Sequence, residues 1–160
     1  MEMHIVTLNT KYRTVAAAKA NPDGIAVLGF FFEISESDNP SLKHLVSKLK
    51  FLREPGSQVV LDGANPISSL LPADTHVFYR YTGSLTTPGC NQVVTWSVFR
   101  SKIAVSERQM DEFRSLMSGE KNEAGETLRR VDNFRPEQKL GDRQIFVSPR
   151  AAPSGEVMVV

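Results

Sequence analysis

The 160-residue sequence has few of the residues on which thiol and metal chemistry depends. It contains one cysteine, one tryptophan and three histidines. Cys90 has no partner for a disulfide within the chain, so it is either an inert buried thiol or one half of a pair completed elsewhere. CxxC pairs, glycine-rich phosphate loops and the G-x-S-x-G motif are absent as well. The sequence therefore gives no support to a nucleotide-binding or a hydrolase function.

An excess of charge and a long apolar run are also missing. Nineteen Lys and Arg against 18 Asp and Glu leave a net charge of +1, so no surface for nucleic acid or an acidic membrane is predicted. The longest apolar run, Ile25 to Phe32, is much shorter than the roughly 20 residues of a membrane span. The first residues have no basic region and no small-residue cleavage site, so no signal peptide is expected. The composition is that of one globular domain.

Short apolar runs between turn signals predict more strands than helices. Residues 25–34 are almost continuously apolar, which is typical of a central strand covered on both faces. Other strands are predicted at 3–8, 58–61, 76–81, 92–99 and 144–147. Helices are predicted at 15–20, after Asn39-Pro40-Ser41, and after the capping box of Ser106 and Gln109, whereas 118–130 is expected to be a surface loop. Isolated helices among many strands indicate an α+β fold that is predominantly β.

Two of the histidines are predicted to lie at the surface. His44 follows Lys43 in an amphipathic helical pattern, where a solvated imidazole is the usual outcome. His76 follows Asp74 and Thr75 at the start of a predicted strand. Neither is predicted to bind a metal.

His4 differs because a carboxylate lies two residues away. On a strand, Glu2, His4 and Val6 point to one face, where Glu2 can accept the second imidazole N–H and fix the tautomer. Two interpretations follow from these residues alone: an ordinary surface or core histidine, or a metal ligand. A catalytic zinc would need three protein ligands, and no other histidine has a matching spacing.

The segment from Tyr81 to Trp96, YTGSLTTPGCNQVVTW, holds two turn signals, a Thr-Thr pair and the only cysteine and tryptophan. Its hydroxyl residues have no recognisable base nearby, so nucleophilic catalysis by them is not predicted. Six sequence blocks, two of them within this segment, together resemble the α-class carbonic anhydrases. In chain order the blocks are EMHIV from Glu2, NTKY from Asn9, PDGIAVLG from Pro22, YTGSLTTP from Tyr81, VTW from Val94, and NFRP from Asn133 with RQ at Arg143.

The resemblance implies that residues 1–147 are the C-terminal part of an α-carbonic anhydrase domain and that 148–160 form a C-terminal tail. The implied fold is a large, twisted, mostly antiparallel sheet with peripheral helices. The implied reaction is the reversible hydration of carbon dioxide to bicarbonate, with zinc as the cofactor and zinc-bound hydroxide as the nucleophile.

By position, His4 resembles the third of the family's three zinc ligands, and Glu2 the carboxylate that orients it. Thr86 resembles the threonine whose hydroxyl accepts a hydrogen bond from the zinc-bound hydroxide. The resemblance places Tyr81 in the hydrogen-bond network near the metal. It assigns substrate contacts to Val6, Val27, Leu85, Thr86, Thr87 and Trp96.

The departures from the family pattern concern the metal. The family's other two ligands, a His-x-His pair on an upstream strand, have no counterpart in the sequence. The resemblance therefore implies a truncated chain that is inactive alone, with uncovered sheet edges that favour poor stability or self-association. Cys90 matches one half of a disulfide of secreted and membrane-anchored members, which is compatible with an extracellular parent protein. The alternative is a non-catalytic carbonic-anhydrase-related binding module.

Overall fold

A computed structural model describes residues 1–63 and 66–149 of the chain. Of the predicted tail, 148–160, residues 150–160 lie outside the described residues. The chain divides into two compact units. The first unit comprises Met1–Phe32, Pro72–Lys102 and the described part of Phe134–Val160, and the second comprises Glu33–Leu71 and Ile103–Asn133.

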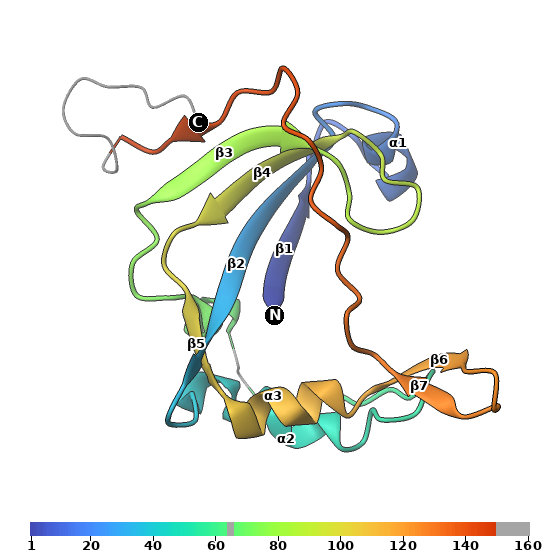
Figure 1. Ribbon diagram of the computed structural model, residues 1–160. Helices are drawn as coiled ribbons and strands as arrows, with labels where there is room; N and C mark the ends of the chain where they lie inside the picture. The colour runs from blue at the N-terminus through green and yellow to red at the C-terminus, as the bar shows by residue number, and fades with distance from the viewer. Residues whose placement is uncertain (64–65, 150–160) are drawn as a thin grey trace. The chain divides into compact units, whose positions relative to one another are not determined.

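A mixed sheet forms the framework of the first unit (Figure 1). In spatial order its strands are β1 (Glu2–Leu8), β2 (Ile25–Ser35), β4 (Val94–Phe99), β3 (Phe78–Gly83) and β8 (Phe146–Val147). β2 and β4 are parallel, whereas the other pairs along this path are antiparallel. The prediction of a predominantly β fold with few short helices is confirmed.

Residues 9–24 connect β1 to β2. This connection contains α1 (Val15–Lys19), whose first turn is capped by the Thr14 side chain. Asn21 to Gly24 then form the predicted turn, in which the Gly24 N–H donates to the Asn21 carbonyl oxygen at 3.0 Å. A Cβ atom at Gly24 would lie 1.9 Å from the Ala18 carbonyl oxygen, so only glycine fits there.

The prediction of a central strand covered on both faces is confirmed for the middle of β2 and wrong for its end. β2 is central in the sheet, and Val27 and Phe30, which point to opposite faces, are both buried, whereas Phe31 and Ile34, also on opposite faces, are about half exposed. The apolar pattern therefore extends beyond the part of the strand that is covered. The buried core of the first unit lies against one part of the sheet and consists of Ala18, Ile25, Val27, Val93, Val94 and Trp96.

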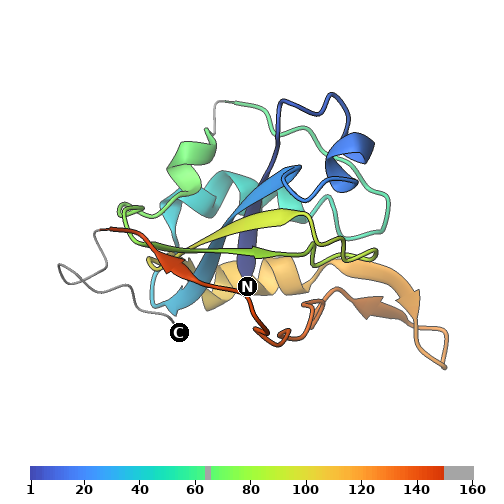
Figure 2. The same cartoon turned by 90° about the horizontal axis from the view of Figure 1, so that it is seen from above.

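The second unit contains the longer helices and a separate hairpin (Figures 1 and 2). Its elements are a 3-10 helix (Pro40–Leu42), α2 (Lys43–Leu49), a second 3-10 helix (Ile67–Leu70), β5 (Ile103–Ser106), α3 (Glu107–Arg114), β6 (Met117–Lys121) and β7 (Thr127–Arg129). β5 pairs with β2, which runs on into this unit. The predicted capping box of Ser106 and Gln109 is present at the start of α3. Among the described residues, no helix has both the length and the apolar character that a membrane span requires.

Two predictions for the second unit are wrong. Residues 58–61 do not form a strand, because no neighbouring strand pairs with them and Val60 is 80% exposed. Residues 118–130 form most of the β6–β7 hairpin rather than a loop, and Figure 2 shows this hairpin in orange. Its turn is closed by the Gly125 N–H, which donates to the Asn122 carbonyl oxygen, with Gly125 at a φ of +81° that glycine adopts readily.

Candidate functional site

One row of residues crosses four strands of the sheet and contains most of the strand positions predicted for the site. Val6 lies opposite Val27, Val27 opposite Trp96, and Trp96 opposite Tyr81. Directly opposed residues on neighbouring strands point to the same face of a sheet. The structure therefore brings these four predicted residues onto one face, which is called the site face below.

His4 and Glu2 point to the site face as well, because they precede Val6 by two and four positions on β1. The His4 Nε2 atom is 3.3 Å from the Glu2 Oε1 atom, so the carboxylate lies where it can orient the imidazole. The His4 side chain is 25% exposed. The ring is thus partly enclosed and still accessible from solvent.

The His4 ring also contacts the tryptophan of the site face. The two ring centroids are 4.8 Å apart with an interplanar angle of 72°, an edge-to-face arrangement that aromatic rings favour. Gly29 is the residue opposite His4 on β2, and it has no side chain to separate the two rings. A methyl group there would lie 3.5 Å from the Trp96 ring, an ordinary van der Waals distance, so the site has room for alanine as well.

Tyr81 and Trp96 form the buried end of the site face. Trp96 is 6% exposed, and its Nε1–H donates to the Ser84 carbonyl oxygen at 3.1 Å. The Tyr81 ring stacks beside Trp96 with centroids 6.5 Å apart. Burial raises the pKa of the Tyr81 hydroxyl, so this group is neutral near pH 7. It can therefore act as a hydrogen-bond donor, which a network position would require.

The remaining predicted residues lie in the loop of residues 84–93 between β3 and β4, called the site loop below. Leu85 packs against the buried core, whereas Thr86 and Thr87 are exposed. Three backbone hydrogen bonds lie within the loop, all at 3.0 Å: the Leu85 and Val93 N–H groups donate to the Asn91 carbonyl oxygen, and the Cys90 N–H donates to the Thr87 carbonyl oxygen. Cys90 is a free, partly buried thiol with a φ of +43°.

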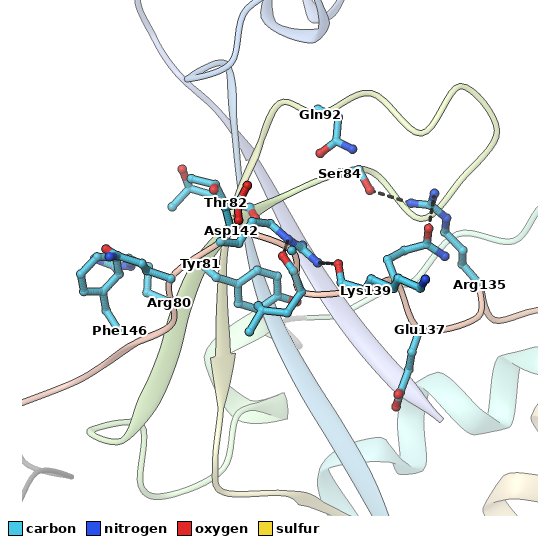
Figure 3. A pocket seen from close by; sticks show the side chains of 16 residues that line it. Arg80, Tyr81, Thr82, Ser84, Gln92, Arg135, Glu137, Lys139, Asp142 and Phe146 are labelled. Atoms are coloured by element: carbon cyan, nitrogen blue, oxygen red, sulfur yellow. Dashed lines mark hydrogen bonds between the residues drawn. The ribbon is translucent and has the colours of Figure 1, made fainter. Parts of the chain in front are cut away.

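An open groove of about 1140 Å³ borders the site loop and is drawn in Figure 3. Residues 135–146 form one side of it, and residues of β3 and β4 form the other. The groove contains four cationic side chains, Arg80, Arg135, Lys139 and Arg143, and two acidic ones, Glu137 and Asp142. The three guanidinium groups donate hydrogen bonds to oxygens of the protein itself. All three guanidinium groups of the groove therefore have hydrogen-bond partners within the chain.

Arg135 is a residue of this region that sequence reasoning missed. Its Nη1 atom donates to the Ser84 Oγ atom at 2.6 Å, a bond visible in Figure 3. The two residues are 51 positions apart, so no local pattern predicts the contact. The only available signal is that Arg135 belongs to the NFRP block, to which no role was assigned.

The described residues do not form a zinc site by themselves. No group of three His, Cys, Asp or Glu residues in the described part of the chain could hold a metal ion. His76 is exposed and its Nδ1 atom lies 2.9 Å from Asp74, while His44 belongs to the second unit and lies near Asp62. His76 is thus at the surface, as predicted, whereas His44 is only partly exposed and its Nε2 atom is buried, so the prediction of a fully solvated His44 is wrong. A single imidazole on the site face is fewer than the three protein ligands that a catalytic zinc needs.

Comparison with known proteins accounts for this arrangement. Residues 1–149 match the family model of the eukaryotic-type carbonic anhydrases. The chain is 39% identical to carbonic anhydrase 15 of Mus musculus, over 98% of the chain and 49% of that protein. It is 42% identical to carbonic anhydrase 7 of Homo sapiens, over 94% of the chain and 55% of that protein. The chain thus spans about half the length of the curated relatives that it matches, and it belongs to the eukaryotic-type carbonic anhydrase family.

Proposed function

We propose that this chain supplies part of the catalytic centre of a carbonic anhydrase, which converts carbon dioxide and water reversibly to bicarbonate and a proton. The observation that supports the proposal most strongly is the site face, where His4, Glu2 and Trp96 meet beside the loop that carries Thr86. In this family the names of the relatives describe the same activity. Their similarity to this chain covers nearly all of its residues.

The proposed roles follow the chemistry of each side chain. His4 is the imidazole that would contribute to a metal centre, and Glu2 orients it by accepting from its other ring nitrogen. Thr86 has a short hydroxyl side chain that is both donor and acceptor, which suits it to orienting the oxygen that attacks carbon dioxide. Thr87 forms the polar side of the substrate pocket, and Tyr81 belongs to the hydrogen-bond network behind it.

Apolar side chains on the same face suit carbon dioxide, which has no net charge or dipole. Val6, Val27, Leu85 and Trp96 are the residues proposed to contact it. Val27 and Trp96 are buried in the core, whereas Val6 is 56% exposed. The proposed apolar contact surface is therefore buried at Val27 and Trp96 and exposed to solvent at Val6.

Zinc bound by three protein ligands makes hydroxide available near neutral pH, which is the chemistry that the family reaction uses. Because the described residues offer one imidazole for such a centre, the proposal assigns no activity to the 160-residue chain alone. It assigns activity to a chain in which two more imidazoles join His4. The proposal does not depend on the second unit.

The test is to measure zinc binding and carbon dioxide hydration with the purified 160-residue chain. We expect no tight stoichiometric zinc binding and a hydration rate equal to the buffer blank. If the gene encodes residues before Met1 that include a His-x-His pair, the longer product should bind one zinc per chain and hydrate carbon dioxide. In that product, His4→Ala should abolish both.

Two outcomes would contradict the proposal. One is tight zinc binding and hydration by the 160-residue chain itself, with both retained in His4→Ala. The other is an upstream sequence without the two imidazoles, together with an inactive longer product. The second outcome would favour a non-catalytic carbonic-anhydrase-related binding module.

A further inference from the structure

The site loop has exposed threonines at its tip, whereas its later part is attached to the rest of the unit. Val93 is buried in the core, and the Asn91 Nδ2 atom donates to the Lys19 carbonyl oxygen at 3.3 Å. Neither threonine is buried, so the position of the first half of the loop depends on the packing of Leu85 and on the groups that bind Ser84. A loop held only by its own turn would move on the nanosecond timescale. What fixes this loop against the sheet is therefore relevant to any role of Thr86.

Arg135 fixes the start of the site loop. Its Nη1 atom donates to the Ser84 Oγ atom at 2.6 Å and is 3.4 Å from the Leu85 carbonyl oxygen, which it also contacts as a donor. Its Nη2 atom donates to the Gln138 Oε1 atom at 3.2 Å. The planar guanidinium thus holds the site loop with one nitrogen and the C-terminal segment with the other, a geometry that lysine cannot reproduce.

Ser84 is also bound by Trp96, a residue of the site face. Its carbonyl oxygen accepts from the Trp96 Nε1–H at 3.1 Å, while its hydroxyl accepts from Arg135. Trp96 is in turn the residue that the His4 ring meets edge-on. A continuous set of contacts therefore runs from Arg135 through Ser84 and Trp96 to His4, and Thr86 lies two residues after Ser84.

We propose that Arg135 is a positioning residue, which acts through Ser84 to hold Thr86 at a fixed place relative to Trp96 and His4. The proposal rests on the proposed function, because Thr86 matters only if the site face is catalytic. Arg135 itself contacts neither Thr86 nor His4 in the described hydrogen bonds. It acts by restricting the loop, and it is not a catalytic residue.

Arg143 provides a matched comparison within the same C-terminal segment. Its guanidinium donates to the Lys139 and Leu140 carbonyl oxygens at 2.7 and 2.9 Å and lies 5.9 Å from the Tyr81 ring. It also donates to the Thr82 carbonyl oxygen, at 3.5 Å. Arg143 therefore holds the same segment to β3 and makes no bond to the site loop.

The experiment compares Arg135→Ala with Arg143→Ala in the 160-residue chain by NMR. Trp96 is the only tryptophan, so its indole N–H gives one assignable signal whose solvent exchange reports the bond to Ser84. The ¹⁵N order parameter of Thr86 reports the motion of the loop itself. We expect Arg135→Ala to speed indole exchange about tenfold, which corresponds to about 1.4 kcal/mol in loop opening. The Thr86 order parameter should fall from about 0.85 to below about 0.6. Arg143→Ala should leave both signals nearly unchanged.

Three further variants extend the test, and two of them, Ser84→Ala and Arg135→Lys, can still be measured if Arg135→Ala folds poorly. Ser84→Ala removes the hydroxyl acceptor and leaves the carbonyl bond to Trp96, so it should loosen Thr86 in the same direction. The double variant should be no looser than Arg135→Ala, since both changes break one interaction. Arg135→Lys keeps the charge without the fork and should restore the order parameter only in part.

The proposal is overturned if Arg135→Ala leaves the Thr86 order parameter unchanged, or if Arg143→Ala has the same effect. It is also overturned if the faster indole exchange is fully explained by a lower free energy of global unfolding, measured with urea on the same samples. None of these signals requires zinc or carbon dioxide. The role of Arg135 can therefore fail while the proposed function stands, and the reverse outcome can be distinguished as well.

Discussion

Two regions of this chain, the Gln109 network of the second unit and the site face of the first, hold their polar groups in different ways. In the second unit, Gln109 is fully buried, and both its side-chain oxygen and its side-chain nitrogen form hydrogen bonds. Its Oε1 atom accepts from the backbone N–H groups of Asn39 and Ser106, at 2.9 and 3.3 Å, and its Nε2 atom donates to the Asn39 carbonyl oxygen at 2.9 Å. Gln109 thus binds both the N–H and the carbonyl group of Asn39, so one buried side chain links α3 to the residue before the first 3-10 helix.

In the first unit, the polar groups of the site face are left partly open. Glu2 and His4 are partly exposed, and Thr86 lies at an exposed loop tip. What is enclosed there is aromatic and apolar, with Trp96 and Val27 in the core. From this difference we expect the hydrogen bonds of Gln109 to stabilise the second unit, and ring packing to stabilise the site face, which keeps its polar side chains available.

The largest expected effect comes from removing the ring on which the site face is built. Trp96→Ala should lower the free energy of unfolding by about 3 to 5 kcal/mol, because it deletes a buried aromatic side chain and leaves a cavity. The measurement is urea unfolding followed by far-UV circular dichroism. The control is Phe31→Ala, because Phe31 lies on β2 and is 49% exposed. This variant should lower the free energy of unfolding by less than about 1 kcal/mol. Equal losses in the two variants would contradict the idea that ring packing holds the site face.

The next effect is expected in the buried network of the second unit. Gln109→Met keeps the side-chain volume but leaves the Asn39 N–H, the Asn39 carbonyl and the Ser106 N–H without their partner. Buried polar groups without partners are costly, so the free energy of unfolding should fall by about 2 to 3 kcal/mol. Gln58→Met is the control, since Gln58 is exposed in the same unit. If the two variants unfold at the same urea concentration, the network is not what stabilises this unit.

Local signals in the sequence predict part of this contrast. Ser106 and Gln109 are three residues apart, so their capping box is visible as a sequence pattern before a helix. The bonds of Gln109 to Asn39 span 70 positions and have no such signal. The predicted strand at 58–61 failed for a related reason, because β-propensity cannot supply a neighbouring strand.

The site face is predicted in the same partial way. Alternation along β1 is sufficient to place Glu2, His4 and Val6 together. Their meeting with Trp96 depends on the parallel pairing of β2 with β4, whose residues are far apart in sequence. Without the family resemblance, no pattern in the sequence would have indicated that register. The contact between Arg135 and Ser84 was missed for the same reason.

A smaller effect is expected from acid, because both units contain carboxyl groups with a lowered pKa, Asp23 and Asp74 in the first and Asp38 and Asp62 in the second. The Arg108 guanidinium, followed by the Ser106 hydroxyl, lowers the pKa of Asp38 by hydrogen bonding to its carboxylate. A carboxyl group with a lowered pKa in the folded state contributes stability above its unfolded pKa of about 3.9, and this contribution disappears as the pH falls through the folded pKa. Asp38→Asn should therefore lose less thermal stability than the wild type between about pH 5 and pH 2.5.

The check is the melting temperature of both proteins across that pH range. Arg108→Ala removes the main cause of the lowered Asp38 pKa. Its melting temperature should therefore also fall less than that of the wild type as the pH is lowered. If the melting temperature of Asp38→Asn falls with pH as steeply as that of the wild type, other carboxylates control acid unfolding.

The smallest effect on stability is expected at the pair that matters most for the proposed function. Glu2 and His4 have side-chain exposures of 42% and 25%, and their closest atoms are 3.3 Å apart. Partly exposed pairs of this kind contribute little, so Glu2→Gln should change the free energy of unfolding by less than about 0.5 kcal/mol at pH 7. Urea unfolding followed by Trp96 fluorescence measures it. A loss above about 1 kcal/mol would mean that the pair is needed to hold β1 in the sheet. With stability unchanged, a tenfold to about hundredfold loss of zinc affinity in a longer product that binds the metal would assign Glu2 to orienting His4, because carboxylates that hold a ligand imidazole have effects of that size.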